Sequence, residues 1–285
     1  MSQTVAVAGA TGYLGRHVCA ALADEGFAVR ALVRSRQTAL EPHSFPAPAL
    51  QDIVTEWRVV DYARPDTLSG VLDGADRVVS TLGVTRQKAS PWDIDFLGNL
   101  RLLEQAEACG VRSFCYANVL RSESGTSLIM RAKHAFSQVL RRSPVSGQIV
   151  NPSGYFSDMT DVLLMARKGI GVVIGDGQAH FNPIHGADLA AFIAEKVTGP
   201  AGEWDVGGPD VFTYQELAEL AFDIVGRRGR IVHLGLGATR TLIGIADHAS
   251  LQASNLARFF LEGMALDATG TPVGSRHLAD YWRAL

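Results

Sequence analysis

The amino-acid sequence predicts an α/β protein built on a doubly wound parallel sheet, with a small lobe near its C-terminus. Three observations predict this class. Short apolar runs alternate with helical patterns, a glycine-rich turn separates the first run from the first helix, and single glycines end several helices. Strands that alternate with helices pair in parallel through right-handed crossovers. A chain of 285 residues buries roughly three quarters of the surface that its unfolded form exposes, so it needs no disulfide for stability.

The predicted strands are short apolar runs bounded by glycine or polar residues. They span residues 4–8, 28–33, 57–60, 77–81, 113–118, 148–150, 172–174, 203–206 and 230–234. Helices are predicted where apolar residues recur every three or four positions, as at 92–109, 127–142, 157–168 and 187–197. Gly26, Gly110 and Gly226 follow helical patterns and are expected to end them. Thr213 and Glu216 form a T-x-x-E capping box that predicts the start of another helix.

The composition argues against several classes of protein. With 26 basic and 29 acidic residues, the chain has no excess of positive charge with which to hold a nucleic acid backbone. Cys19, Cys109 and Cys115 form no CxxC pair and cannot all be paired, which is typical of a reducing compartment. The first residues lack the basic region of a signal peptide, and no apolar run approaches the ~20 residues of a spanning helix. We therefore expect a cytoplasmic protein that binds no nucleic acid and inserts into no membrane.

The glycine-rich turn reads Gly9-Ala10-Thr11-Gly12-Tyr13-Leu14-Gly15 and lies between the first strand and the first helix. In a dinucleotide-binding turn, the first glycine allows the tight turn and the second lets the backbone approach a pyrophosphate. The third lets helix and strand pack closely. The helix N-terminus then offers N–H groups to the phosphates. We expect the backbone of this whole turn, with Thr11, Tyr13 and Leu14, to contact a cofactor.

The same residues resemble a known family. GATGYLGRHV is similar to the start of the extended and atypical short-chain dehydrogenase/reductases, which have GxxGxxG spacing. IVNPSGYF (149–156) resembles their "I-x-R-P" turn, with Asn151 where Arg is usual, and NPIHGADLAAFI (182–193) resembles a second segment, with Asp188 at its acid. The nearest resemblance is to the NmrA-like, isoflavone-reductase-like and divinyl-reductase-like branch. It implies a Rossmann NAD(P)-binding fold in which Asn151 and Pro152 contact the cofactor.

We expect residues 1–153 to form the Rossmann NAD(P)-binding core. Residues 154–285 contain elements that are too short and too interleaved for an independent domain. They are expected to supply the remaining strands and a small substrate-binding lobe. Ligands of open α/β sheets bind beyond the carboxyl ends of the strands, and such a lobe would cover that edge.

The choice of nicotinamide cofactor depends on the end of the second strand. Sites that prefer NAD place an acidic residue there for the ribose 2′-hydroxyl. This chain has Arg34 instead, and a guanidinium pairs well with a 2′-phosphate, so NADP(H) is predicted over NAD(H). By resemblance, Asp61 would lie beside the adenine amino group, although an aspartate in a turn is the alternative. Thr81, Leu82 and Gly83 resemble the loop beside the nicotinamide ribose.

The usual proton-donating pair of the superfamily, Tyr-x-x-x-Lys on one helix, is incomplete. Lys133 lies in the expected helix, but Ile129 stands four residues earlier, and none of the six tyrosines precedes a lysine at this spacing. Asn118 replaces the usual serine after the fifth strand. Lys133 could itself be the acid, or it could hold the ribose while Tyr155 or Tyr116 donates the proton. The third alternative is that the protein binds NADP(H) without turnover.

We therefore predict an NADP(H)-dependent oxidoreductase that transfers a hydride to a C=C or C=O bond of a small organic substrate. Lys133, Tyr155 and Asn118 are its predicted catalytic residues. The alternatives are a non-catalytic redox sensor of the NmrA-like type and an accessory nucleotide-binding subunit. His180 and His185 lie near Asp188 but lack the spacing of metal ligands, so no metal site is predicted.

Overall fold

The structure is a computed structural model that describes residues 2–84, 89–235, 237–239, 241, 244 and 251–285. The chain divides into two compact units. The first comprises Met1–Asn118, Ala132–Asn151 and Leu189–Trp204, and the second comprises Val119–Arg131, Pro152–Asp188 and Asp205–Leu285. The division assigns segments from both halves of the sequence to each unit.

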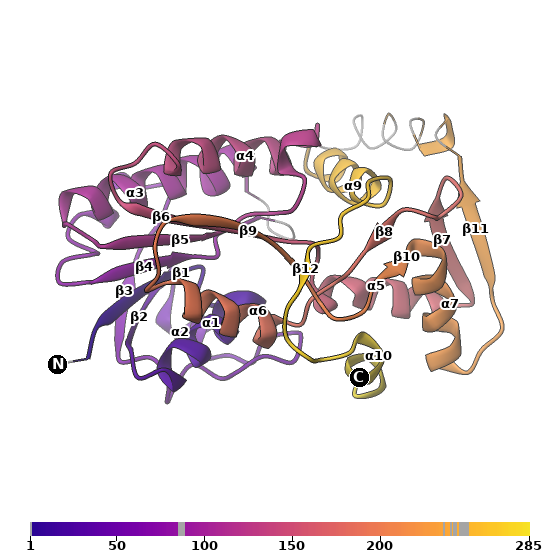
Figure 1. Ribbon diagram of the computed structural model, residues 1–285, viewed down its shortest axis with the longest axis horizontal. Coiled ribbons are helices and arrows are strands. Elements are labelled where there is room, and N and C mark those ends of the chain that lie inside the picture. The colour runs from indigo at the N-terminus through magenta and orange to yellow at the C-terminus, as the bar shows by residue number, and fades with distance from the viewer. Residues whose placement is uncertain (1, 85–88, 236, 240, 242–243, 245–250) are drawn as a thin grey trace. The chain divides into compact units, whose positions relative to one another are not determined.

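An eight-stranded sheet forms the centre of the fold, in the order β12-β9-β6-β5-β4-β1-β2-β3 (Figure 1). The strands are β1 (Thr4–Ala8), β2 (Ala28–Val33), β3 (Glu56–Val59), β4 (Arg77–Ser80), β5 (Ser113–Ala117), β6 (Ser146–Pro152), β9 (Gly202–Gly207) and β12 (Thr271–Pro272). All neighbours from β3 to β6 are parallel. Residues 5–8 of β1 are fully buried, as expected for a central strand covered on both faces. The predicted parallel α/β fold is confirmed.

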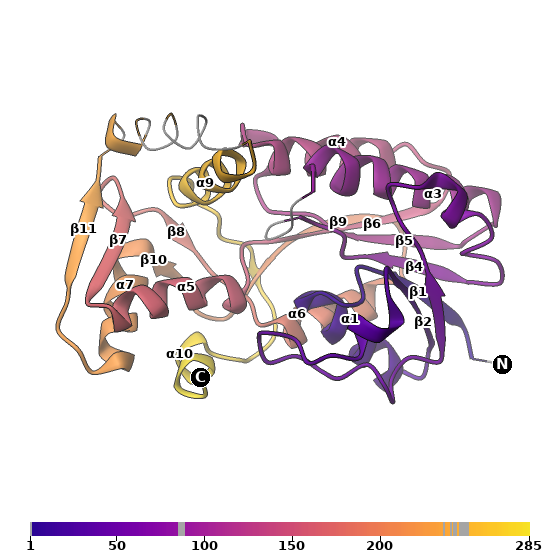
Figure 2. The ribbon, with the colours of Figure 1, turned by 180° about the vertical axis from the view of Figure 1, so that it is seen from behind.

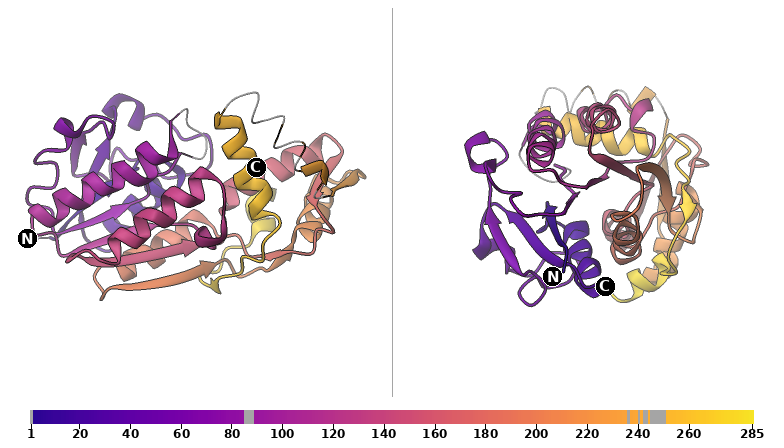
Figure 3. Two further views of the ribbon diagram at one scale, coloured as in Figure 1. Left: turned by 90° about the horizontal axis from the view of Figure 1, so that it is seen from above. Right: turned by 60° about the vertical axis from the view of Figure 1, so that its left-hand side comes forward.

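Helices cover both faces of the sheet. In Figure 1, α3 and α4 lie on one side of the strands, and α1, α2 and α6 lie on the other; Figure 3 shows α3 and α4 side by side. Their bounds are α1 (Tyr13–Asp24), α2 (Arg36–Ala39), α3 (Asn99–Ala108), α4 (Leu128–Leu140) and α6 (Gly186–Lys196). Phe136 of α4 packs on Tyr116 of β5, with ring centroids 4.7 Å apart. This contact places the preceding turn of α4, which carries Lys133, over the end of β5.

Several sequence expectations for the helix ends are confirmed. Gly26, Gly110 and Gly226 follow their helices with φ angles of +82°, +68° and +64°. Thr213 and Glu216 form both hydrogen bonds of the capping box.

Two segments differ from expectation. The helix predicted at 92–109 begins as a π-helical segment, η2 (Trp92–Gly98), before α3. The helical turn α2, which follows β2, is not among the helices predicted from the sequence. A turn this short gives little hydrophobic periodicity, so the sequence pattern does not show it.

The second unit has a core of its own, built around Phe156, Phe181 and Trp282. It contains α5 (Phe156–Arg167), α7 (Tyr214–Val225), α9 (Leu251–Gly263), α10 (Leu278–Arg283) and two short sheets. The parallel pair β7 (Ile170–Ile174) and β11 (Arg230–Leu234) forms one of them (Figure 2), and the antiparallel pair β8 (His180–Phe181) and β10 (Phe212–Thr213) forms the other. Among the described helices, none has the length and apolar character needed to cross a membrane.

Candidate functional site

The glycine turn joins the end of β1 to the first turn of α1. Gly9 has a φ of +76°, and a Cβ there would lie 2.7 Å from Thr81 Oγ1. A Cβ at Gly15 would overlap the carbonyl oxygen of Gly9 and lie 2.8 Å from Ala10 Cα, so helix and strand meet backbone to backbone. Gly12 is the N-cap of α1 and has no side chain to cap the first N–H groups. The N-terminus of α1 therefore has the donors that an anion requires.

The other residues of the turn contribute side chains to packing. Tyr13 and Leu14 are buried, and the Tyr13 ring stands edge-on to His17 at 5.0 Å between centroids. The carbonyl oxygen of Thr11 accepts a hydrogen bond from Nε of Arg16 at 3.2 Å. A cofactor contact from Tyr13 or Leu14 would therefore come from the backbone, as the sequence predicts.

Arg34 directly follows β2, and its side chain is exposed. Within the described part of the chain it forms no hydrogen bond or ion pair. Arg36, two residues later, instead lies over the ring of Trp57 at 5.7 Å. At the end of the next strand, Asp61 Oδ1 accepts a hydrogen bond from the Ala63 N–H at 3.0 Å, so this carboxylate also stabilises its own turn.

The loop after β4 connects the glycine turn to Lys133. Thr81 Oγ1 donates to the carbonyl oxygens of Ala8 and Gly9 at 3.0 and 3.2 Å. Lys133 Nζ donates to the carbonyl oxygen of Leu82 at 3.2 Å, and a Cβ at Gly83 would lie 3.5 Å from the same Nζ. Three predicted regions, the turn, the loop and Lys133, are thus in contact within the first unit.

Lys133 has three further contacts. Its Nζ lies 3.3 Å from the carbonyl oxygen of Ala117 and 3.1 Å from Oδ1 of Asp95, and it stands over the Tyr116 ring at 5.2 Å. Together with Leu82, the ammonium therefore has two hydrogen-bonded carbonyl oxygens and one carboxylate as an ion-pair partner. Asp95 is 0% exposed and Lys133 is 8% exposed. Burial raises the pKa of Asp95, while the charge of Lys133 opposes that shift.

Asp95 is a residue of this site that the sequence pattern does not predict. Asn99 donates to the backbone oxygen of Asp95 at 2.8 Å and bonds Ser80 Oγ at the end of β4 at 2.5 Å, so η2 is anchored beside the sheet. The available signal is the pair Asp95 and Asn99, four residues apart in an otherwise apolar stretch. Two polar residues at this spacing share a helix face.

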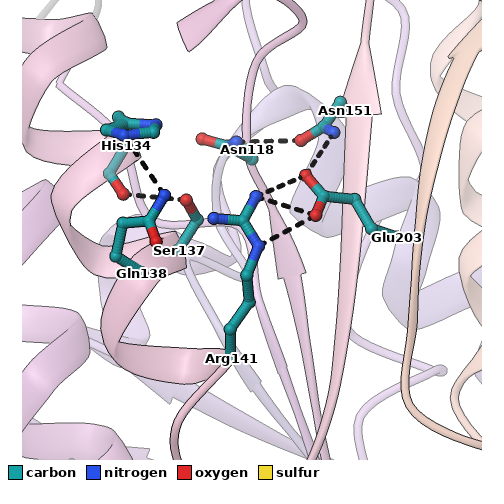
Figure 4. Close-up of polar contacts among 7 residues, drawn as sticks. All are labelled: Asn118, His134, Ser137, Gln138, Arg141, Asn151 and Glu203. Carbon is teal, nitrogen blue, oxygen red and sulfur yellow. Dashed lines mark hydrogen bonds and ion pairs between the residues drawn. The ribbon is translucent and has the colours of Figure 1, made fainter. Parts of the chain in front are cut away.

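Asn118 and Asn151, predicted separately, are hydrogen-bonded to each other. Asn118 Nδ2 donates to Asn151 Oδ1 at 2.8 Å, and Asn151 Nδ2 donates to Glu203 Oε1 at 2.9 Å (Figure 4). Arg141 pairs with the same carboxylate through two nitrogens, at 2.7 to 3.0 Å. A carboxylate only accepts hydrogen bonds, so it fixes the orientation of both amides in this row.

The remaining predicted residues belong to the second unit. Tyr155 is the N-cap of α5, and its backbone forms a bridge to Ile184. Pro152 accepts a hydrogen bond from the Leu120 N–H at 3.0 Å. Asp188 binds the N–H groups of Ser275 and Arg276 and the Arg276 guanidinium, which ties the C-terminal segment to the first turn of α6.

His185 forms a local hydrogen bond at the start of α6. Its Nδ1 accepts from the Ala187 N–H at 3.1 Å, and burial lowers the pKa of its ring. Across the described residues, no group of three or more His, Cys, Asp or Glu is placed to hold a metal ion.

Comparisons with known proteins identify the family of the chain. Residues 9–200 match the NAD(P)H-binding family. Divinyl chlorophyllide a 8-vinyl-reductase of Zea mays is 27% identical over 262 residues, which cover 86% of this chain and 65% of the relative. NADH dehydrogenase [ubiquinone] 1 alpha subcomplex subunit 9 of Arabidopsis thaliana is 27% identical over 241 residues, which cover 80% and 59%. The chain spans less than two thirds of the length of both relatives.

Among solved structures, the NADPH-dependent quinone oxidoreductase of Escherichia coli with bound NADPH superposes with a TM-score of 0.73. The sequences are 19% identical, and the match covers 98% of this chain and 99% of that one. This likeness confirms the Rossmann-type fold, and the relatives confirm the resemblance to the atypical short-chain branch. Since the family match covers more than half of its residues, the chain belongs to the NAD(P)H-binding family.

Proposed function

We propose that the protein is an NADP(H)-dependent oxidoreductase of the atypical short-chain group that reduces a small organic substrate. The observation that carries this proposal is the direct connection between the glycine turn, the loop at Thr81–Gly83 and Lys133. A glycine turn alone would also suit a structural nucleotide site. A buried cation beside the loop adds a charged group where the reacting end of the cofactor is expected.

The first unit contains the groups that would hold the cofactor. The N-terminus of α1 would bind the diphosphate, because its N–H groups have no side-chain cap. Arg34 would pair with the 2′-phosphate, Asp61 would lie near the adenine, and the loop at Thr81–Gly83 would border the nicotinamide ribose. The NADPH bound by the structurally similar quinone oxidoreductase supports the choice of cofactor. When bound, NADP(H) supplies the hydride.

Lys133 is proposed to act as a fixed positive charge. Two carbonyl acceptors and the ion pair with Asp95 hold the ammonium in one place, and loss of its proton would leave Asp95 as a buried carboxylate without a cation. The proton of the product would then come from water or from another side chain, for which Tyr155 stays a candidate. Hydride addition to a carbonyl gives an alkoxide, a stronger base than the enolate formed from an activated C=C bond, so it depends more on an adjacent proton donor. Position 129, four residues before Lys133, is a buried isoleucine that cannot donate a proton. We therefore favour an activated C=C bond, the chemistry named for the Zea mays relative.

The test is a titration of the purified protein with NADPH, followed by a panel of enones, quinones and carbonyl compounds. We expect NADPH to bind, at least one enone or quinone to oxidise it, and Lys133→Ala to lose turnover while retaining cofactor binding. Absence of NADPH binding would refute the proposal. Faster turnover with ketones than with enones would refute the C=C assignment.

A non-catalytic regulator or accessory subunit is the second candidate. It is favoured by the engaged ammonium of Lys133 and by a relative that is named as a subunit of a larger assembly. This reading predicts that no compound in the panel oxidises NADPH. It also predicts different affinities for NADP⁺ and NADPH, measured by calorimetry.

A further inference from the structure

Arg16 is a buried cation next to the glycine turn, and the proposed cofactor contacts do not use it. It lies in the first turns of α1 and is 3% exposed. Its guanidinium donates to four main-chain carbonyl oxygens. They are Thr11 at 3.2 Å, Ala39 at 3.0 Å, Glu41 at 2.7 Å and Pro48 at 3.2 Å.

These acceptors join separate parts of the chain. Thr11 belongs to the glycine turn, Ala39 and Glu41 mark the end of α2, and Pro48 lies in the following loop. Arg16 forms no ion pair with any acidic side chain that the structure describes, and burial lowers its pKa. Only a forked donor such as arginine can reach four carbonyls at once. Burial of an unpaired charge costs free energy, so the hydrogen bonds of Arg16 must offset that cost by stabilising the segments that they join.

The element that depends on these contacts is α2. Four residues form only one turn, and an isolated helix of this length is unstable in water. At its N-terminus, Ser35 Oγ accepts from the Thr38 N–H at 3.4 Å. At its C-terminus, Arg16 binds the carbonyl oxygens, where a cation also suits the helix dipole. Arg34 directly precedes this turn, so the path of the chain after Arg34 depends on Arg16.

We propose that Arg16 is a positioning residue for cofactor selectivity. It holds α2 against the glycine turn, so that Arg34 and the start of α2 stand at a defined distance from the diphosphate and can bind the 2′-phosphate. The inference rests on the proposed NADP(H) function and extends it, because it assigns selectivity to a side chain that does not contact the cofactor.

The experiment compares NADPH and NADH binding, by nicotinamide fluorescence, in the wild type, Arg16→Met and Arg16→Lys. Lysine keeps the charge but has a single nitrogen with three N–H groups, so it cannot span four carbonyls. We expect both variants to lose about tenfold more affinity for NADPH than for NADH, the scale of one charged hydrogen bond. The ligand 2′-AMP carries the 2′-phosphate, whereas ADP carries the diphosphate. Only the affinity for 2′-AMP should show the additional loss.

Arg77→Met is the matched control, because Arg77 also binds a main-chain carbonyl, that of Val197 at 2.8 Å, but lies at the opposite end of the strands. It should leave the ratio of the two affinities unchanged. Equal losses for NADPH and NADH in both Arg16 variants would overturn the proposal, since they would indicate a general effect on the fold or on the diphosphate. In Arg34→Ala, the added Arg16→Met change should cost no further selectivity.

A measurement on the wild-type protein keeps the test independent of the folding of the variants. Hydrogen exchange of the amides at 36–41 should slow on addition of 2′-AMP and not on addition of adenosine. No difference between the two ligands would overturn the proposal. A wild-type protein that binds neither NADPH nor NADH would instead contradict the proposed function, so the two failures are distinguishable.

Discussion

The buried pair of Lys133 and Asp95 gives a prediction about stability that needs no substrate. Lys133→Met removes the cation while keeping a side chain of similar length. The Asp95 carboxylate, which is 0% exposed, then loses the charge that opposes its burial. We expect this variant to be less stable than the wild type and to take up a proton at Asp95.

The size of the effect follows from the geometry. Two unit charges 3.1 Å apart attract by about 5 kcal/mol at an effective dielectric constant of about 20. Desolvation offsets much of this attraction in the intact pair, but removal of one partner leaves that cost uncompensated. The expected loss for Lys133→Met is therefore about 3–5 kcal/mol at pH 7. Replacement of both residues, as Lys133→Met with Asp95→Asn, should recover a large part of it.

The pH dependence has a definite sign. A folded-state pKa that burial raises above the unfolded value of about 4 means that the folded protein binds the proton more tightly. The contribution of Asp95 to stability is then greatest at low pH. It falls as the pH rises from the unfolded pKa to the folded pKa, by up to about 1.4 kcal/mol per pH unit. Without Lys133 the pKa of Asp95 rises further, so the decline in Lys133→Met should continue to higher pH than in the wild type.

The assay is urea unfolding followed by tryptophan fluorescence between pH 5 and pH 8. Lys133→Met should lose stability steadily over this range relative to the wild type, and the double variant should not. The reasoning fails if the single and double variants have the same stability and slope. In that case the charge of Lys133 does not offset the desolvation of the Asp95 carboxylate.

Three further predictions follow from the same geometry. Arg34→Ala should weaken NADPH binding by about 1–3 kcal/mol and leave NADH nearly unchanged in fluorescence titration, and equal losses would contradict the 2′-phosphate role. Gly15→Ala should lower the melting temperature far more than Gly12→Ala, because a Cβ at Gly15 would overlap the carbonyl oxygen of Gly9, whereas a Cβ at Gly12 would lie 3.3 Å from it. Similar melting temperatures of the two variants would contradict this. Asp188→Ala should cost about 1–3 kcal/mol of unfolding free energy, since two N–H groups and the Arg276 guanidinium lose their shared acceptor. Arg276→Ala, which removes a half-exposed partner of Asp188, should cost about 0–1 kcal/mol. A larger loss in Arg276→Ala than in Asp188→Ala would show that the backbone hydrogen bonds of Asp188 are not the main contribution.

Local signals explain why much of the fold could be predicted from the sequence. The glycine turn combines a required positive φ at Gly9 with a backbone contact at Gly15, and both requirements act within seven residues. Helix ends such as Gly226 and the capping box at Thr213 are equally local. Each of these features is determined by neighbours along the chain, so sequence spacing is sufficient to find it. Lys133 was identified differently, by the resemblance to the short-chain family, whose lysine lies in the corresponding helix.

The partners of the predicted residues could not be predicted, because they are far apart in sequence. Asp95 precedes Lys133 by 38 residues, and only the parallel order of β4 and β5 brings their elements together. Glu203 lies 52 residues after Asn151, on the strand β9 beside β6. Arg16 has ordinary helical spacing, and its role becomes visible only when the carbonyls that it binds are known. The sequence therefore located the residues but not the contacts that determine their charge and orientation.

These contacts narrow the roles that the sequence left open for Lys133. An acid must release its proton at little cost, yet release from Lys133 would leave the Asp95 carboxylate, which is 0% exposed, without its cation. A residue that binds a ribose hydroxyl must have an N–H group to donate, and the carbonyls of Leu82 and Ala117 account for two of the three N–H groups of Lys133. Lys133 can bind a ribose hydroxyl by sharing one N–H between two acceptors, whereas donation of its proton requires the ion pair to break. These contacts therefore support the proposed role of Lys133 as a fixed cation rather than as the proton donor.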